Sequence, residues 1–189
     1  MKSYTPAQFI AVYNPAFRTL HWLMALLILI GLGLGVWASQ LPKGDLRSEI
    51  LFVHKSFGVA VLALVVIRIL ARLVLGLPAY PAPLGRLTEI AAGGAHAALY
   101  VLMIALPISG WVMSGFAGRE VSFFGLYTLP QLVSENKELA GRAALAHEVL
   151  AWAIGVVIAV HLLAVVWHVV VKRDAVLTRM WPRWTPART

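Results

Sequence analysis

Four long apolar segments constrain this chain more than any other feature of its sequence. They cover about residues 20–38, 51–75, 90–116 and 145–171. A helix of about 20 apolar residues is long enough to cross the roughly 30 Å hydrocarbon core of a bilayer. Backbone polar groups inside a membrane must be bonded within the protein, which restricts spanning segments to helices and closed barrels. The sequence therefore predicts an all-α integral membrane four-helix bundle that forms a single domain over residues 1–189.

Composition agrees with a membrane protein. Hydrophobic residues make up 60% of the chain and charged residues only 13%, whereas soluble domains carry about 25% charged residues. The first apolar segment is long, lacks a small-residue cleavage site and begins at a histidine, so we expect it to be retained as a span rather than cleaved as a signal peptide.

The distribution of basic residues predicts the orientation. The amino-terminal tail, the second half of the second span with its connection to the third, and the carboxyl-terminal tail together hold ten Lys and Arg against two acids, while the other side holds six against six. Cytoplasmic loops are enriched in Lys and Arg, which places both termini in the cytoplasm. This asymmetry also explains the pI of about 10.3 as a topology signal, with anionic lipid rather than nucleic acid as the partner.

Histidines within the spans are the strongest indication of function. His147 and His161 lie fourteen residues apart in the last span, which is roughly 21 Å along a helix and nearly the same face. Ionisable residues inside a membrane are costly and are usually functional. The predicted topology puts His54 at the outer depth of His147 and His21 at the inner depth of His161, so two pairs of facing histidines are expected.

Two such pairs favour haem iron with two axial imidazoles at each site. Zinc would require three or four ligands that converge at one point, and the chain has no cysteine, which excludes iron–sulfur clusters and covalent haem attachment through cysteine. Two non-covalent b-type haems are therefore the predicted cofactors. Small residues are expected to make room for them: Gly31, Gly33, Gly35, Gly58, Gly93, Gly94 and Gly155.

Two further histidines leave alternatives open. His96 begins the third span at the cytoplasmic side, and His168 follows His161 by seven residues. Each could replace a ligand at the inner site or serve a quinone pocket, and each could equally be an interfacial or inter-helix polar residue.

Arg68 lies fourteen residues after His54 and so reaches the depth of the inner site. Arginine forms strong bidentate pairs with carboxylates, so Arg68 is a candidate partner of a haem propionate. Arg18 is a weaker candidate at the start of the first span, as are Lys55 and Arg142 at the outer site. The alternative is that such side chains extend to lipid headgroups, which we favour for Arg72.

These residues stand among motifs that together resemble bacterial cytochrome b561. The motifs are Arg18-Thr19-Leu20-His21-Trp22, His54-Lys55 followed by Gly58, Ala105-Leu106-Pro107 before Gly110, the Phe124-Gly125 to Pro130 loop, His147-Glu148 followed by His161 and His168, and the tail from Lys172 to Pro182. The resemblance covers nearly the whole chain. It implies a di-haem protein of the bacterial inner membrane that carries electrons across the bilayer and commonly exchanges them with ubiquinone. Some similar proteins oxidise periplasmic superoxide, which makes superoxide a candidate donor and superoxide:ubiquinone oxidoreduction a candidate activity.

Two other functions remain as alternatives. The chain could be the haem b membrane anchor of a dehydrogenase or hydrogenase partner, or a histidine-lined metal-ion transporter, which would show no haem absorption. Cationic side chains on the outer side could attract superoxide, but that side has no net charge. The sequence has no catalytic triad order and no Gly-rich phosphate loop, so it gives no support for hydrolysis or nucleotide binding.

Overall fold

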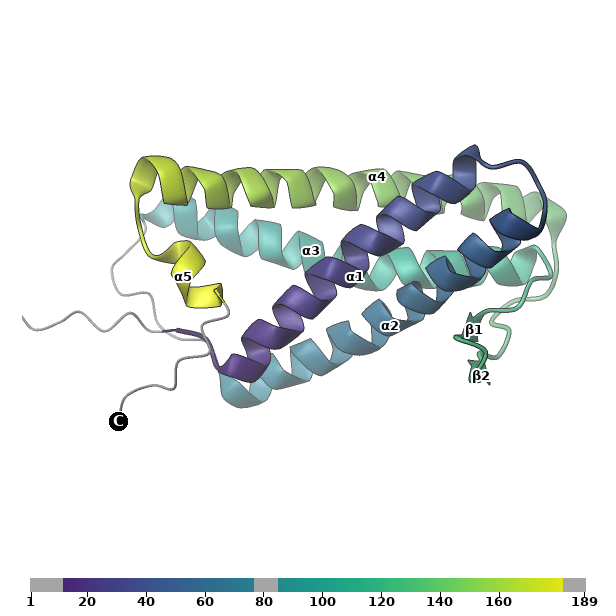
Figure 1. Cartoon of the computed structure of the whole chain (residues 1–189), viewed down its shortest axis with the longest axis horizontal. Coiled ribbons are helices and arrows are strands. Elements are labelled where there is room, and N and C mark those ends of the chain that lie inside the picture. Colours follow the sequence, from purple (N-terminus) through teal and green to yellow (C-terminus); the bar gives the residue numbers. More distant parts are fainter. Residues whose placement is uncertain (1–11, 77–84, 182–189) are drawn as a thin grey trace, which may run out of the picture.

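The computed structural model describes residues 12–76 and 85–181 and contains four long helices: α1 (Pro15–Gln40), α2 (Asp45–Leu75), α3 (Arg86–Phe116) and α4 (Lys137–Trp167) (Figure 1). Each is long and apolar enough to cross a membrane, with the last span continuing to Lys172. The prediction of an all-α membrane bundle is confirmed. The first three predicted spans lie inside α1, α2 and α3, and the fourth (145–171) runs through α4 into the π-helical turn that follows it; each helix begins before its span does.

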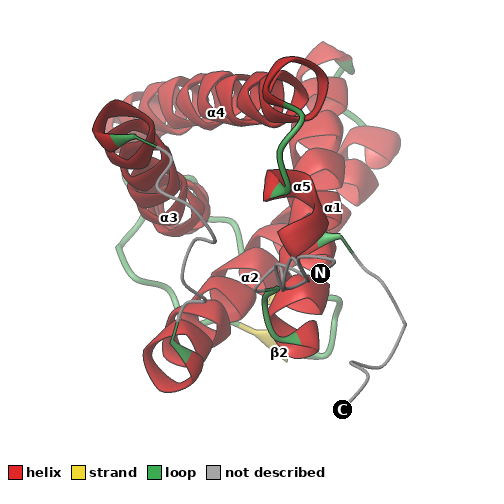
Figure 2. Cartoon of the chain, turned by 90° about the vertical axis from the view of Figure 1, so that its left-hand side faces the viewer, coloured by secondary structure: helices red, strands yellow, loops and turns green. Residues whose placement is uncertain are grey.

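The four helices form two hairpins that differ in how they meet. α1 packs along α2, α3 packs along α4, and α2 joins the hairpins by packing on α3. Within the part of the chain that the structure describes, α4 has only sparse backbone contacts with α1 and α2. Figure 2 shows this arrangement from one end of the bundle. Side chains, rather than close backbone packing, therefore bridge α4 to the first hairpin.

Midway along the bundle, five buried apolar side chains form one layer. They are Met24 of α1, Val61 and Val65 of α2, Met103 of α3 and Ile154 of α4. Ile154 lies seven residues from both His147 and His161. Because all four helices contribute, this layer holds the bundle together and separates two levels of polar residues.

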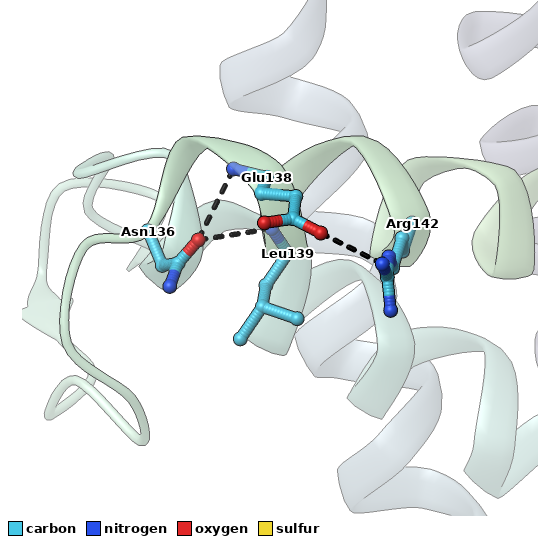
Figure 3. Close-up of polar contacts among 4 residues, drawn as sticks. All are labelled: Asn136, Glu138, Leu139 and Arg142. Atoms are coloured by element: carbon cyan, nitrogen blue, oxygen red, sulfur yellow. Dashed lines mark hydrogen bonds and ion pairs between the residues drawn. The ribbon is translucent and has the colours of Figure 1, made fainter.

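Polar capping residues extend the helices beyond their apolar spans. Asn136 caps α4 by accepting hydrogen bonds from the backbone N–H groups of Glu138 and Leu139, and Glu138 forms an ion pair with Arg142 one turn later (Figure 3). Side-chain caps and pairs of this spacing stabilise a helix start. The connection between the third and fourth predicted spans is therefore shorter than the sequence indicates, since residues 137–144 are already helical.

A short β-hairpin lies between α3 and α4. Strands β1 (Ser122–Phe123) and β2 (Tyr127–Thr128) pair antiparallel. The turn between them has positive φ angles at Phe124 (49°) and Gly125 (73°). Fully buried Ser56 of α2 fastens the hairpin, because its hydroxyl accepts from the Phe124 N–H and lies 3.0 Å from the Ser122 carbonyl. We call this end of the bundle the β-hairpin end; no pattern in the sequence predicted these strands.

The opposite end, which we call the α5 end, is closed by the segment after α4. The chain continues through a π-helical turn (His168–Lys172) and a left-handed Arg173 (φ 51°) into the short helix α5 (Val176–Met180). Arg18 donates from Nη1 to the Trp181 carbonyl at 2.9 Å, and the Trp22 indole donates to the Met180 carbonyl at 2.8 Å. The segment after α4 therefore packs against the start of α1.

Candidate haem-binding site

Near the β-hairpin end, His54 of α2 faces His147 of α4. Their ring centres are 6.2 Å apart and the ring planes are perpendicular, at 90°. Imidazole nitrogens bind metal ions at about 2 Å, so two rings that bind one ion from opposite sides have centres roughly 6 Å apart. The separation of His54 and His147 matches that arrangement.

Near the α5 end, His21 of α1 faces His161 of α4. Their ring centres are 6.5 Å apart at 68°, so the structure brings together the second predicted pair as well. His96 of α3 is also near, with its ring centre 5.6 Å from that of His161. The level near the α5 end, where the sequence predicts the inner pair, therefore holds three imidazoles, and geometry beyond ring separation has to distinguish the ligands.

Helix packing distinguishes them. A haem ligated on both faces must lie between the two helices that supply its ligands. His21 and His54 lie on α1 and α2, which contact α4 only sparsely in the described residues, whereas His96 lies on α3, which packs directly along α4. His96 is also exposed, while the other four histidines named as ligands are half-buried. The pairs that span the two hairpins therefore suit a haem better than the His96–His161 pair.

Glycines provide the close packing of His54 and His147, the pair predicted to be the outer one. A Cβ on Gly35 of α1 would lie 3.0 Å from Cε1 of His54, and a Cβ on Gly110 of α3 would lie 3.0 Å from Cε1 of His147. Gly31, Gly33, Gly93, Gly94 and Gly155 have nothing within 4 Å of such a Cβ. Among the predicted small residues, Gly35 is thus the one that a histidine ring packs against. Gly110, which occurs in the family-like motif, is a contact that the sequence analysis did not assign.

Each outer imidazole has a hydrogen-bond partner at Nδ1. His54 Nδ1 lies 2.8 Å from the Gly31 carbonyl oxygen, and His147 Nδ1 lies 2.9 Å from the Ser109 hydroxyl. A carbonyl only accepts, so His54 carries its proton on Nδ1 and leaves Nε2 free. Histidines that bind metals through one nitrogen are commonly held in this way through the other.

Two arginines are buried near the inner pair. Arg68 is 7% exposed; it donates from Nε to the Tyr100 hydroxyl and stands 4.3 Å over the Phe17 ring. Arg18 is 8% exposed, and its buried Nε has no hydrogen-bond partner among the described residues. Arg72, in contrast, is exposed. Buried cations with donor capacity to spare suit an anionic group such as a haem propionate.

His168 lies away from both pairs and is bonded to the turn that follows it. Its Nδ1 lies 2.5 Å from the Asp174 carboxylate, whose other oxygen accepts from the Val176 N–H. Burial by itself raises the pKa of Asp174, but the hydrogen bonds from His168 and Val176, together with the positive charge of Lys172, hold that pKa below its ordinary value. The structure therefore shows His168 as a partner of Asp174.

Four membrane-capable helices with facing imidazoles at two depths define a class of protein, the membrane bundles that hold haem between helices. Among the described residues, no group of three or more His, Cys, Asp or Glu is placed to hold a metal ion directly. This finding gives no support for a zinc site or a histidine-lined metal path.

Comparison with known proteins gives the family. The family model described as prokaryotic cytochrome b561 matches residues 12–183, and the chain belongs to this family. It is 33% identical over 178 residues to cytochrome b561 homolog 2 of Escherichia coli (strain K12), which covers 93% of this chain and 92% of that protein. It is 33% identical over 169 residues to the probable superoxide oxidase CybB of Yersinia pestis, covering 87% and 92%. Cytochrome b561 homolog 1 of E. coli is 28% identical over 165 residues.

Family membership and the four spans make this chain a multi-pass bacterial membrane protein that binds b-type haem and transfers electrons. The resemblance noted in the sequence is confirmed.

Proposed function

We propose that this chain carries electrons across the bacterial inner membrane through two b haems. His54 and His147 would hold the outer haem, and His21 and His161 would hold the inner haem. The observation that carries the proposal is the pair of ring separations, 6.2 and 6.5 Å, at two levels of one helix. Bound haem supplies a reversible one-electron change at its iron, and the protein sets its potential through ligands, burial and hydrogen bonds.

The residues around the two levels have separate tasks in this proposal. Arg68 and Arg18 offset the negative charge of the inner propionates, and burial strengthens that interaction. The apolar layer around Val65 and Ile154 excludes water between the levels, since both side chains are at most 1% exposed. Gly35 and Gly110 allow the outer imidazoles to lie flush against neighbouring helices.

We further propose that both termini are cytoplasmic and that electrons pass from periplasmic superoxide to ubiquinone. Two superoxide ions would each lose one electron to become O₂, and one quinone would take up both electrons with two protons. The similarity to a probable superoxide oxidase supports this donor. At the β-hairpin end, Lys55 donates a hydrogen bond to the Glu120 carbonyl at 2.9 Å, and its ammonium group interacts electrostatically with Arg119. Such cations attract small anions at short range.

The test begins with the purified chain in detergent or lipid nanodiscs. Pyridine haemochrome analysis should give two haems per chain, and stopped-flow mixing with superoxide should reduce them before added ubiquinone reoxidises them. A single haem in fully loaded protein would contradict the two-site proposal. Haem reduction that requires a partner dehydrogenase, with no response to superoxide, would indicate a membrane anchor subunit instead.

A further inference from the structure

The two outer histidines are held by matching contacts in the two hairpins. A Cβ on Gly35 would lie 3.0, 3.4 and 3.8 Å from Cε1, Nδ1 and Nε2 of His54, and a Cβ on Gly110 would lie at the same three distances from the same atoms of His147. Each ring therefore rests in the same manner on the preceding helix of its own hairpin, α1 for His54 and α3 for His147.

The two histidines differ in the set of groups that can accept the Nδ1 proton. For His54 it is the backbone carbonyl of Gly31, four residues before Gly35. For His147 it is the side chain of Ser109, next to Gly110, together with the Leu106 backbone carbonyl. The Ser109 hydroxyl lies 2.7 Å from the Leu106 carbonyl, four residues before Gly110, and donates its hydrogen there. The Leu106 carbonyl thus corresponds to that of Gly31, and the added Ser109 hydroxyl, which contacts both ring and carbonyl, is the difference between the two sites.

The direction of these bonds fixes the tautomer of His147. A serine hydroxyl has one hydrogen and two lone pairs. Because that hydrogen goes to the Leu106 carbonyl, which can only accept, the oxygen must accept from the His147 ring. His147 therefore carries its proton on Nδ1 and leaves Nε2 bare. Chains of hydrogen bonds polarise one another, so a hydroxyl that donates to a carbonyl is a stronger acceptor for the imidazole.

We propose that Ser109 is a positioning residue for the outer haem: it holds the His147 ring, keeps the proton on Nδ1 and makes Nε2 a stronger iron ligand. This inference rests on the proposed role of His147 as an axial ligand. A hydrogen bond that draws on the Nδ1 proton raises the basicity of the ligating nitrogen, and a more basic ligand stabilises ferric iron. Ser109 therefore lowers the potential of the outer haem. The Nδ1 partner of His54 is a backbone carbonyl, so no side-chain substitution can remove the corresponding hydrogen bond there.

Ser109→Ala tests this role in the haem-loaded protein. We expect the midpoint potential of one haem to rise and its low-spin ferric EPR signal to shift or broaden, while the other haem keeps both properties. Ser109→Thr retains the hydroxyl and should restore the wild-type potential and spectrum. Ser114→Ala is the matched control, because Ser114 is a buried serine on the same helix and, among the described residues, Ser109 and not Ser114 is hydrogen-bonded to a histidine ring.

The outcomes separate this inference from the proposed function. Loss of one haem in Ser109→Ala with retention in Ser109→Thr supports the role of the hydroxyl. Wild-type potentials and EPR spectra in Ser109→Ala overturn the inference. An equal loss of haem in both variants also overturns it, because haem binding would then depend on the space that the side chain occupies and not on its hydroxyl. If His147→Ala still binds both haems, the ligand assignment itself is wrong, whatever Ser109 does.

Discussion

Gly35 lies directly beneath the imidazole of His54, so close that a single added methyl group would be 3.0 Å from the ring. A carbon at that distance forces the ring or the helix to move, and overpacking of this kind costs about 1–3 kcal/mol. We therefore expect Gly35→Ala to weaken binding of the outer haem by roughly ten- to hundredfold, while the inner haem stays bound. Haem titration of the apoprotein, followed in the Soret band, measures both sites.

Gly33→Ala is the control for this substitution. Gly33 lies on the same helix two residues away, and a Cβ there meets nothing within 4 Å. Both variants gain the same helix propensity, so a difference between them reports the contact with His54. Equal haem affinity in the two variants would show that the ring adjusts without cost.

Arg68 is expected to set the potential of the inner haem through its charge. Arg68→Leu removes a buried cation from the neighbourhood of His21 and leaves any propionate there uncompensated, which favours ferric iron. The inner midpoint potential should fall or the haem should be lost, and the outer haem should change little. Arg68→Lys keeps the charge and should retain most of the potential even though it loses the bond to Tyr100.

Arg72→Leu is the comparison for Arg68. Arg72 is exposed, and its guanidinium stands 5.8 Å from the centre of the Tyr100 ring. A charge at the lipid headgroup region contributes little to a buried potential, so redox titration of this variant should match the wild type. Similar shifts in Arg68→Leu and Arg72→Leu would mean that neither arginine acts on the haem specifically.

Asp174 should make the segment after α4 sensitive to acid. Its pKa lies below the ordinary value of 3.8, so the folded state favours the carboxylate. The resulting stability is present above pH 3.8 and is lost as the pH falls through the lower pKa of the folded state. Asp174→Asn should cost about 1 kcal/mol locally and speed amide exchange in residues 174–180 roughly fivefold at neutral pH.

Hydrogen–deuterium exchange over a pH series measures this effect. The difference between wild type and Asp174→Asn should shrink at acidic pH, because the wild-type carboxyl is then protonated as well. Asp45→Asn, at the start of α2 and the other end of the bundle, should leave residues 174–180 unchanged. A difference that persists undiminished in acid would exclude the carboxylate as its source.

The spans and the depths of the histidines follow from the sequence because each depends on one helix alone. Apolar length predicts a span, and the helical rise puts His54 level with His147 and His21 level with His161. The contacts of Gly110 and Ser109 with His147 depend on how α3 is rotated against α4, which no single-helix pattern contains. The β-hairpin was missed because two strands of two residues each leave no periodicity, and its anchor Ser56 is far away in sequence.

His96 provides the sharpest test of the inner ligand assignment, because it is nearer to His161 than His21 is. Its ring centre lies 5.6 Å from that of His161, against 6.5 Å for His21. However, His96 stands on α3, which packs along α4, and its Nδ1 is bonded to the Ala92 carbonyl of its own helix at 2.7 Å. We therefore expect His21→Ala to reduce the haem content from two per chain to one, and His96→Ala to retain both with a small change in the inner potential. Pyridine haemochrome analysis with EPR of the two variants decides between the ligands: a haem lost in His96→Ala and kept in His21→Ala would assign the inner site to α3 and α4.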